Sequence, residues 1–323
     1  MIVCAGEALI DMVPYASAEG QAFLPRVGGS PCNTAVAAAR LSAPAGFLGS
    51  VSADFFGRQI RARLAENGVS EDFVLECGAP TTLAVVGGVP GSAPEYMFYI
   101  DGTSAAMLDG DKLDALFGKL ALADCVVFGS ISLLLEPSGS ALSTLCSRLA
   151  ALPDGPLVAL DPNVRQAMVR DRTSYLTRLE ALIARADIVK LSDEDCAYLY
   201  PDAAFEAALG RILDMGPRLV AGTGGPRGSV GLKRNADGTM TRVAAAALAV
   251  KVADTVGAGD TFPGALLAWM ARNKLLEREK LAELSESELA ACLAFASCAS
   301  GLVCTRRGSE PPFLSELTPY LYR

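Results

Sequence analysis

Residues 252–270 read VADTVGAGDTFPGALLAWM and place carboxylates on both sides of a glycine turn that opens an apolar helix. Free N–H groups at a helix N-terminus, with glycines that allow close backbone approach, are suited to binding a phosphoryl group. A carboxylate at Asp260 repels phosphate, so phosphate binding alone does not explain it. Its position is explained if it takes the proton of a hydroxyl group that attacks the phosphoryl group. The alternative is a simple helix cap; a Walker A sequence, GxxxxGK[ST], is absent.

Two segments near the N-terminus offer groups that could bind hydroxyls. In GEALIDM, Asp11 follows the first expected strand, and in VGGSPCNTAVAAARLS the pair Gly28 and Gly29 precedes a helix whose first turn holds Asn33. An asparagine both donates and accepts hydrogen bonds, which suits a pair of sugar hydroxyls. The alternatives are a turn aspartate and a capping asparagine. Asp11 becomes a candidate ligand only if it faces the GGSPCN segment.

Two polar loops follow buried strands farther along the chain. In LDPNVR, Asp161, Asn163 and Arg165 come after a strand whose C-terminal end should line the binding crevice of a parallel sheet. A loop with a salt bridge is the alternative. The glycine-rich turn VAGTGGPRG, residues 220–228, could run along the phosphates of a nucleotide, although it is not a Rossmann GxGxxG sequence.

Composition excludes several classes of function. The 323 residues include no histidine, which rules out Ser-His-Asp and Cys-His nucleophiles, HExxH zinc sites and an imidazole base. A carboxylate, lysine, tyrosine or cysteine must therefore transfer protons. The net charge of −8 argues against nucleic acid or an anionic membrane surface as a partner.

The cysteines and the apolar runs indicate a cytoplasmic protein. Nine cysteines, an odd number without a CxxC pair, favour buried free thiols in a reducing compartment over disulfides or a metal site. The N-terminal MIVCAGEALIDM carries acids and lacks a basic region, which is typical of a first core strand and not of a signal peptide. No uninterrupted apolar run approaches the roughly 20 residues of a membrane span.

Short apolar runs alternate with helical patterns. We expect helices over 54–67, 258–273 and 286–303, and buried strands at IVCAG, AGFLGSV, DCVVFG, LVALD, DIVKL, RLVAG and the run ending VKVAD. Alternating strands and helices predict βαβ units and a doubly wound, mainly parallel sheet.

Two stretches interrupt this alternation. Residues 81–100 read as a hairpin with a Gly/Ser/Pro turn, and residues 10–27 read as another strand pair. We expect them to join into a small second sheet that acts as a lid over the active site; two surface hairpins without a catalytic role are the alternative. The predicted division is a large α/β domain of residues 1–9, 29–79 and 103–323, and a small β lid of residues 10–28 and 80–102.

In this order, the segments resemble the PfkB (ribokinase-like) family of carbohydrate kinases, from GEALID near the start to TRRGSEPP near the end. The segments GGSPCNTAVAAARL and DTVGAGDTFPGA carry most of the resemblance. It implies a three-layer α/β/α fold with a small β lid that is often used in dimer contacts, hence a homodimer. It also implies phosphorylation of a sugar or nucleoside hydroxyl with ATP, Mg²⁺ and a monovalent cation such as K⁺.

The resemblance assigns roles to matching positions. Asp260 resembles the general base, and Gly257, Ala258 and Gly259 resemble the anion hole. The other implied contacts are Asp11, Gly28, Gly29 and Asn33 with sugar hydroxyls; Ser192, Thr223, Gly225 and Gly228 with the nucleotide; and Asp254 and the Val256 carbonyl with the monovalent cation, with Gly308 close by.

Two positions depart from the family pattern. Where the family often carries N-x-x-E near Mg²⁺, KLSDED offers Ser192 and Asp195, with Glu194 as a rival metal contact. In the lid, Ile100 stands where fructokinases and 2-keto-3-deoxygluconate kinases commonly have an arginine. A sugar acid needs a cation to pair with its carboxylate, and Arg165 or Arg26 could supply one.

DPNVR and VKLSDED look most like fructokinases. We therefore expect a ketohexose kinase, with fructose as the substrate and fructose 6-phosphate as the product. The alternatives are a 2-keto-3-deoxygluconate kinase, another PfkB sugar or nucleoside kinase, and a sugar- or nucleotide-binding protein without turnover.

Overall fold

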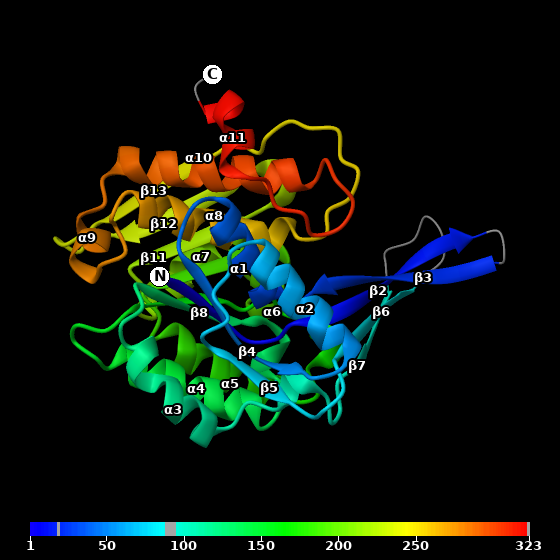
Figure 1. The fold of residues 1–323 in the computed structure, drawn as a ribbon. Helices are drawn as coiled ribbons and strands as arrows, with labels where there is room; N and C mark the ends of the chain where they lie inside the picture. Colours follow the sequence, from blue (N-terminus) through cyan, green and yellow to red (C-terminus); the bar gives the residue numbers. More distant parts are fainter. Residues whose placement is uncertain (18–19, 88–94, 322–323) are drawn as a thin grey trace.

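A nine-stranded sheet forms the centre of the protein (Figure 1). The structure, a computed structural model, describes residues 1–17, 20–87 and 95–321. The strands are β1 Ile2–Ala5, β4 Ala45–Ser52, β5 Val74–Cys77, β8 Cys125–Gly129, β9 Leu157–Asp161, β10 Ile188–Ser192, β11 Leu219–Thr223, β12 Ser229–Arg234 and β13 Met240–Ala245. Their order is β13-β12-β11-β10-β9-β8-β1-β4-β5. The pairs from β11 to β5 are parallel, and β12 and β13 add an antiparallel edge, which confirms the mainly parallel sheet.

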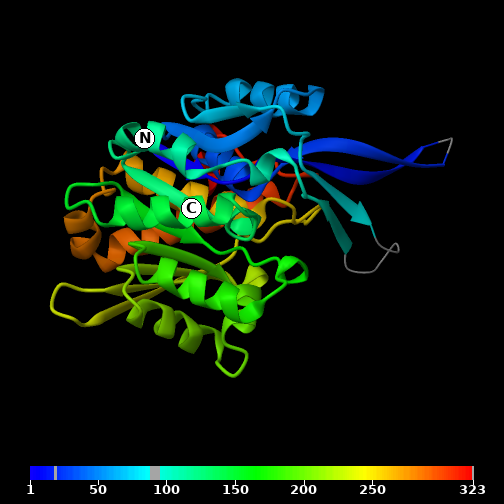
Figure 2. The ribbon, with the colours of Figure 1, turned by 90° about the horizontal axis from the view of Figure 1, so that it is seen from below.

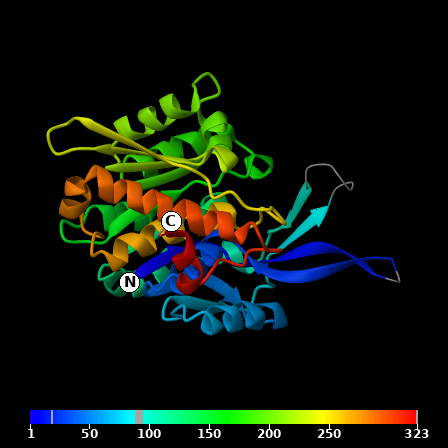
Figure 3. The same ribbon diagram turned by 90° about the horizontal axis from the view of Figure 1, so that it is seen from above.

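Helices cover both faces of this sheet. They are α1 Ser30–Arg40, α2 Phe55–Glu66, α3 Gly110–Leu120, α4 Ser138–Ala150, α5 Arg172–Ile183, α6 Asp193–Leu199, α7 Phe205–Asp214, α8 Ala258–Arg272, α9 Arg278–Glu283, α10 Glu286–Val303 and α11 Leu314–Leu321. One apolar cluster joins the sheet to α1, α2, α8 and α10, and a second joins it to α3, α4, α5 and α7. Figure 2 shows α3, α4 and α5 from below, and Figure 3 shows α10 over the opposite face. The three-layer α/β/α prediction is confirmed.

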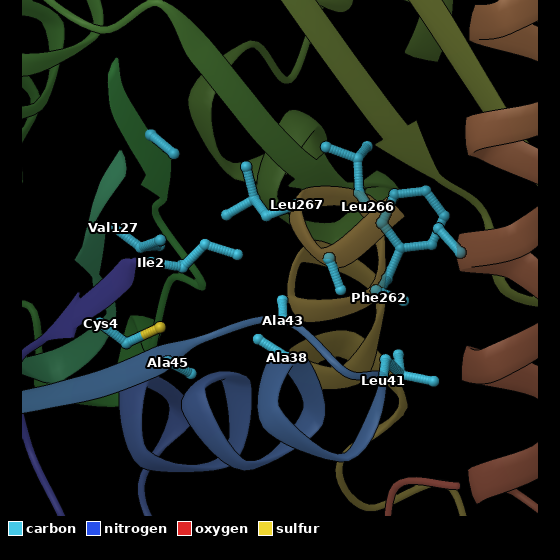
Figure 4. Packing of buried hydrophobic residues seen from close by; sticks show 14 of the residues in the cluster. Ile2, Cys4, Ala38, Leu41, Ala43, Ala45, Val127, Phe262, Leu266 and Leu267 are labelled. Carbon is cyan, nitrogen blue, oxygen red and sulfur yellow. The ribbon is translucent and has the colours of Figure 1, made fainter. Parts of the chain in front are cut away.

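Most residues of the central strands are apolar because both faces of these strands are buried. In β1, Ile2 and Cys4 belong to the cluster on one face, whereas Val3 belongs to the cluster on the other. Figure 4 shows Phe262 and Leu266 of α8 within the first of these clusters. This packing fixes the start of α8 relative to the end of the sheet.

One expected strand is wrong. Residues 250–254, VKVAD, have no strand structure, and Lys251 and Val252 are exposed. The segment lies beyond the edge strand β13 and leads into α8, so its alternating valines face no partner strand. The described part of the chain holds the nine cysteines as free thiols, as predicted; seven are buried, and Cys77 and Cys304 are partly buried.

A second sheet of four strands stands beside the large one. It comprises β2 Leu9–Ser17, β3 Gly20–Gly28, β6 Leu83–Gly87 and β7 Glu95–Tyr99, in the order β3-β2-β6-β7. Both predicted strand pairs are antiparallel, and the parallel pair β2–β6 joins them. The expected Gly/Ser/Pro turn falls in residues 88–94, outside the described residues. In Figures 1, 2 and 3 the β2–β3 hairpin projects away from the large sheet; its role as a lid stays a prediction.

By length and composition, α10 is the one helix in the described ranges that could cross a membrane, with a mean hydropathy of 1.3. Its buried residues include Leu289, Leu293 and Phe295, and 56% of the span lies inside the protein. Such burial is typical of a core helix.

Candidate active site

Asp260 lies in the first turn of α8, at the end of the large sheet that faces the small one. Gly257 precedes the helix with φ 80, in the left-handed region, and a Cβ there would lie 2.3 Å from Ser309 Oγ. Glycine is therefore required by both conformation and space. The N–H groups of Gly259 and Asp260 have no acceptor within the described residues, whereas Ala258 N donates to Thr255 O at 3.2 Å. Two free amides at a helix N-terminus can bind an anion.

Two asparagines hold the Asp260 carboxylate. Asn33 Nδ2 donates to Asp260 Oδ2 at 2.9 Å, and Asn163 Nδ2 donates to Oδ1 at 3.3 Å. Asp260 is 9% exposed. Each carboxylate oxygen retains a lone pair, so it can still accept the proton of an incoming hydroxyl group. The site therefore combines a proton acceptor with free backbone donors in one helical turn.

Asp11 faces the glycine segment, as sugar binding requires. It lies on β2, and a Cβ at Gly28 on β3 would come within 2.1 Å of Asp11 Oδ2. Burial and the neighbouring Asp260 carboxylate raise the pKa of Asp11 to about 7, and Arg165 opposes the shift. The Asp260 carboxylate therefore lies close enough to Asp11 for its charge to raise the pKa of Asp11. The alternative of a turn aspartate does not hold, because Asp11 is part of β2 within the predicted strand pair.

Glu7 is a buried carboxylate that our sequence reasoning missed. It accepts hydrogen bonds from Ser30 N at 3.3 Å and from both Ser132 N and Ser132 Oγ. Burial raises its pKa, and its hydrogen bonds to Ser132 and Ser130 oppose this. Glu7 therefore ties the end of β1 to the start of α1, which carries Asn33.

Lys190 and Asp161 form a buried ion pair beneath the first turn of α8, and the sequence reasoning also missed this lysine. Lys190 Nζ lies 3.2 and 3.3 Å from the two Asp161 oxygens, and the side chains are 5% and 6% exposed. A Cβ at Gly259 would lie 3.8 Å from Lys190 Nζ. Burial raises the pKa of Asp161 to about 7 and Lys190 opposes the shift. Burial alone would lower the pKa of Lys190, but Asp161, Asp195 and Asp260 outweigh burial and raise it.

The expected nucleotide residues gather at the ends of two neighbouring strands. Ser192 ends β10 and Thr223 ends β11, and the two are paired in register. Gly225 and Gly228 follow with φ 54 and φ 87. Their loop is closed by hydrogen bonds between its own backbone groups, and Arg227 pairs with Asp193 at the start of α6.

Asp195 is poorly suited to bind a metal directly. Its Oδ2 accepts from Ser192 N at 2.8 Å and from Ser192 Oγ at 2.7 Å, and its Oδ1 accepts from Val164 N at 2.7 Å. It is 4% exposed, whereas Glu194 is exposed to solvent. The described ranges contain no group of three acids or cysteines that could hold a metal. These residues fit Mg²⁺ that arrives on nucleotide phosphates and keeps its water ligands, not an all-protein metal cage.

Asp254 connects the loop before α8 to the loop before α11. Its Oδ1 accepts from Val256 N at 3.1 Å, and its Oδ2 accepts from Gly308 N at 2.8 Å. The carboxylate therefore lies beside the anion-binding turn, where the monovalent cation was expected.

The described part of the chain also forms a cavity of about 420 Å³. Ile100, Met168, Tyr175 and Arg178 line it, and Asp260 does not. Arg178 donates to Leu133 O and pairs with Glu136, so its charge is already compensated. The reactive groups identified above lie outside this cavity.

The comparisons with known proteins agree with this arrangement. Residues 1–316 match the family described as pfkB family carbohydrate kinase. A fructokinase of Rhizobium leguminosarum bv. trifolii is 34% identical over 90% of this chain and 85% of its own length. Fructokinase-1 of Zea mays is 32% identical over 98% of this chain and 95% of its own. The crystal structure of fructokinase with bound ATP from Xylella fastidiosa superposes with a TM-score of 0.87 at 28% identity, covering 98% of this chain and 97% of that one.

Proposed function

Because the chain belongs to the pfkB family of carbohydrate kinases, we propose that it transfers the terminal phosphoryl group of ATP to the 6-hydroxyl group of fructose. The observation that carries this proposal is the turn at Gly257–Asp260, where free amides and a held carboxylate lie side by side. The similarity to fructokinases along nearly the whole chain supports fructose as the acceptor.

Fructose binds between the base of the small sheet and the start of α1 and α8. Asp11 accepts hydrogen bonds from two of its hydroxyls, and Asn33 and Arg165 contact others. Gly28 leaves room for Asp11 at this position. The acceptor hydroxyl is thereby held beside Asp260, which converts attack on ATP into a step within one complex.

Asp260 removes the proton as the fructose oxygen bonds to the terminal phosphorus. The bond from that phosphorus to the bridging oxygen of ATP breaks, and ADP leaves. The free amides of Gly259 and Asp260 bind the phosphoryl oxygens, and the Lys190–Asp161 ion pair lies beneath them. Preorganised donors of this kind stabilise the charge of the transition state.

ATP lies along the turn that contains Thr223, Gly225 and Gly228, with Ser192 on the neighbouring strand. Bound Mg²⁺ would neutralise phosphate charge, with Asp195 and Glu194 contributing through water. A monovalent cation, with K⁺ as the candidate, would bind at Asp254 and the Val256 carbonyl. The support for this cation is the carboxylate that joins the two loops beside the turn.

The small sheet supports a homodimer. Val13 on β2 and Leu24 on β3 are register partners on the face that carries Asp11, and they are 36% and 41% exposed. Tyr15 is also exposed on this face. Exposed apolar side chains on neighbouring strands favour packing against a second copy of the chain. The free thiols support a cytoplasmic location.

The test is a substrate screen. Purified protein with ATP and Mg²⁺ is assayed for ADP release with fructose, glucose, ribose, 2-keto-3-deoxygluconate and adenosine. We expect fructose to give the highest kcat/KM and the product to be fructose 6-phosphate by NMR. A higher kcat/KM with another acceptor would replace fructose, and no sugar-dependent ADP release would leave only a binding protein.

A further inference from the structure

We propose that Asn163 is a positioning residue that fixes the Asp260 carboxylate, and that Arg165 and Asp195 hold Asn163 in place. The inference rests on the proposed function, because it concerns the base of that reaction. Asn163 supplies the hydrogen bond to Asp260 Oδ1, whereas Asn33 supplies the one to Oδ2. A carboxylate held at only one oxygen can turn about its Cβ–Cγ bond.

Arg165 determines which way the Asn163 amide points. Arg165 Nη1 lies 2.6 Å from Asn163 Oδ1. A guanidinium group only donates hydrogen bonds, so the oxygen of the amide must face Arg165 and its NH₂ group must face Asp260. The reverse orientation would put a carbonyl oxygen against a carboxylate. Arg165 therefore acts on the base through Asn163, in addition to its proposed contact with the sugar.

The backbone at Asn163 is held in an uncommon conformation. Its φ of 42 lies in the left-handed region, which asparagine tolerates better than most residues. The peptide groups on both sides are anchored: Ser130 N donates to Pro162 O at 3.2 Å, and Val164 N donates to Asp195 Oδ1 at 2.7 Å. Strained backbone of this kind persists where surrounding contacts determine it.

Asp195 connects this loop to the nucleotide side of the site. Its other oxygen accepts from both the amide and the hydroxyl of Ser192. One buried carboxylate therefore holds Ser192, a proposed nucleotide contact, and the loop that carries Asn163. This gives Asp195 a positioning role that needs no direct bond to a metal.

Two substitutions at position 163 test the proposal. Asn163→Gly keeps the left-handed backbone and removes the amide. We expect kcat to fall about 10- to 100-fold, the effect of losing one hydrogen bond to a charged group. The KM for fructose and for ATP should change less than about threefold, because the loop stays in place. Lys274→Gly, an exposed position with φ 57, is the matched control and should keep the kcat of the wild type.

Asn163→Asp separates positioning from simple loop structure. The second carboxylate disfavours ionised Asp260, so the acidic limb of the kcat–pH profile, which reports the base in the enzyme–substrate complex, should move to higher pH. The other charged groups around Asp260 are Asp11 on β2, Asp161 on β9 and Lys190 on β10, and all three remain in this variant.

Each outcome decides the question. A lower kcat with unchanged KM in Asn163→Gly, together with a displaced acidic limb in Asn163→Asp, supports the positioning role. A wild-type kcat in Asn163→Gly, a parallel rise of both KM values, or an unmoved limb overturns it. If the wild-type protein does not phosphorylate fructose in the same assay, the proposed function fails instead.

Discussion

Asn33 and Asp260 lie 227 positions apart in the sequence, yet the amide of Asn33 donates to the Asp260 carboxylate at 2.9 Å. The contact depends on the packing of α1 against α8, and Thr34 Oγ1 strengthens it by donating to Asp260 O at 3.2 Å. The orientation of the proposed base is therefore a property of two helices and not of one motif. Any change that separates these helices should reduce turnover before it unfolds the protein.

Asp260→Asn should leave fructose and ATP binding nearly unchanged and lower kcat by at least about 10², because an amide cannot accept the hydroxyl proton. Steady-state kinetics and calorimetric Kd values measure the two effects separately. Asp237→Asn, on the turn after β12, is a matched exposed control. Retained activity in Asp260→Asn would remove this residue as the base.

Gly257→Ala should lower kcat on the order of 10²-fold, because the new Cβ would displace Ser309 and the anion-binding turn. Gly68→Ala provides the control. Gly68 also has a left-handed φ, 69, but a Cβ there meets nothing within 4 Å. It should cost about 1 kcal/mol of stability and leave kcat unchanged. Equal kcat values in the two variants would show that the turn at Gly257 has no catalytic role.

Fructose use should depend on the ionisation of Asp11. Its pKa is raised to about 7 by burial and by Asp260, so the carboxylate becomes fully ionised only above that pH. Because two accepted hydroxyl bonds require the ionised form, kcat/KM for fructose should rise between pH 6 and pH 8. Asp11→Asn should remove this step and weaken fructose binding by about 1–3 kcal/mol. A pH step near 7 that persists in the variant would assign it to another group.

The raised pKa of Asp11 also predicts how the stability of Asp11→Asn relative to wild type changes with pH. The folded-state pKa of Asp11 lies above its ordinary value of 3.8. The favourable contribution of Asp11 to the free energy of unfolding is therefore complete below pH 3.8 and is lost as the pH rises through about 7. Asp11→Asn should therefore raise the Tm relative to wild type at pH 8, with the difference shrinking toward pH 4. A Tm difference that does not vary with pH would contradict this.

Several elements were predictable because local signals decided them. The helix expected over 258–273 is α8, Ala258–Arg272, and the helix expected over 54–67 is α2, Phe55–Glu66. Periodic apolar side chains, together with Gly68 just past the end of the helix, were sufficient to predict α2. The run at 250–254 shows the limit, since its pattern suits a strand but the sheet ends at β13.

The buried charges could not be predicted in the same way. Lys190 is one lysine in an apolar strand, and its partner lies 29 positions away. The register that pairs Val189 with Leu160 brings Lys190 level with Asp161. Only the tertiary pairing of β9 with β10 shows this ion pair. A charged residue inside an otherwise apolar strand is the signal that could have drawn attention to it.

The Lys190–Asp161 pair should behave as a coupled unit. Lys190→Met leaves a buried carboxylate without its partner and should cost about 3–5 kcal/mol. Adding Asp161→Asn should recover part of that loss, because the remaining group is neutral. Urea unfolding of the wild type, both single variants and the double variant gives the coupling free energy. Additive losses would mean that the two side chains do not stabilise each other.

The proposed dimer should depend on the apolar face of the small sheet. Val13→Asp places a charge in that interface and should shift sedimentation toward the monomer, whereas Met240→Asp, at an exposed position on β13 of the large sheet, should not. Wild-type protein that sediments as a monomer at micromolar concentration would contradict the proposal.

Asp11 lies on a strand of the small sheet, whereas Asp260 and the free amides lie in the first turn of helix α8, which packs on the large sheet. The Asp11 contact with the acceptor and the handling of the acceptor's proton are consequently encoded in separate parts of the polypeptide. Redesign of residues 9–28 and 83–99 offers a route to enzymes with new acceptor preferences, because the catalytic residues at the start of α8 can be left unchanged.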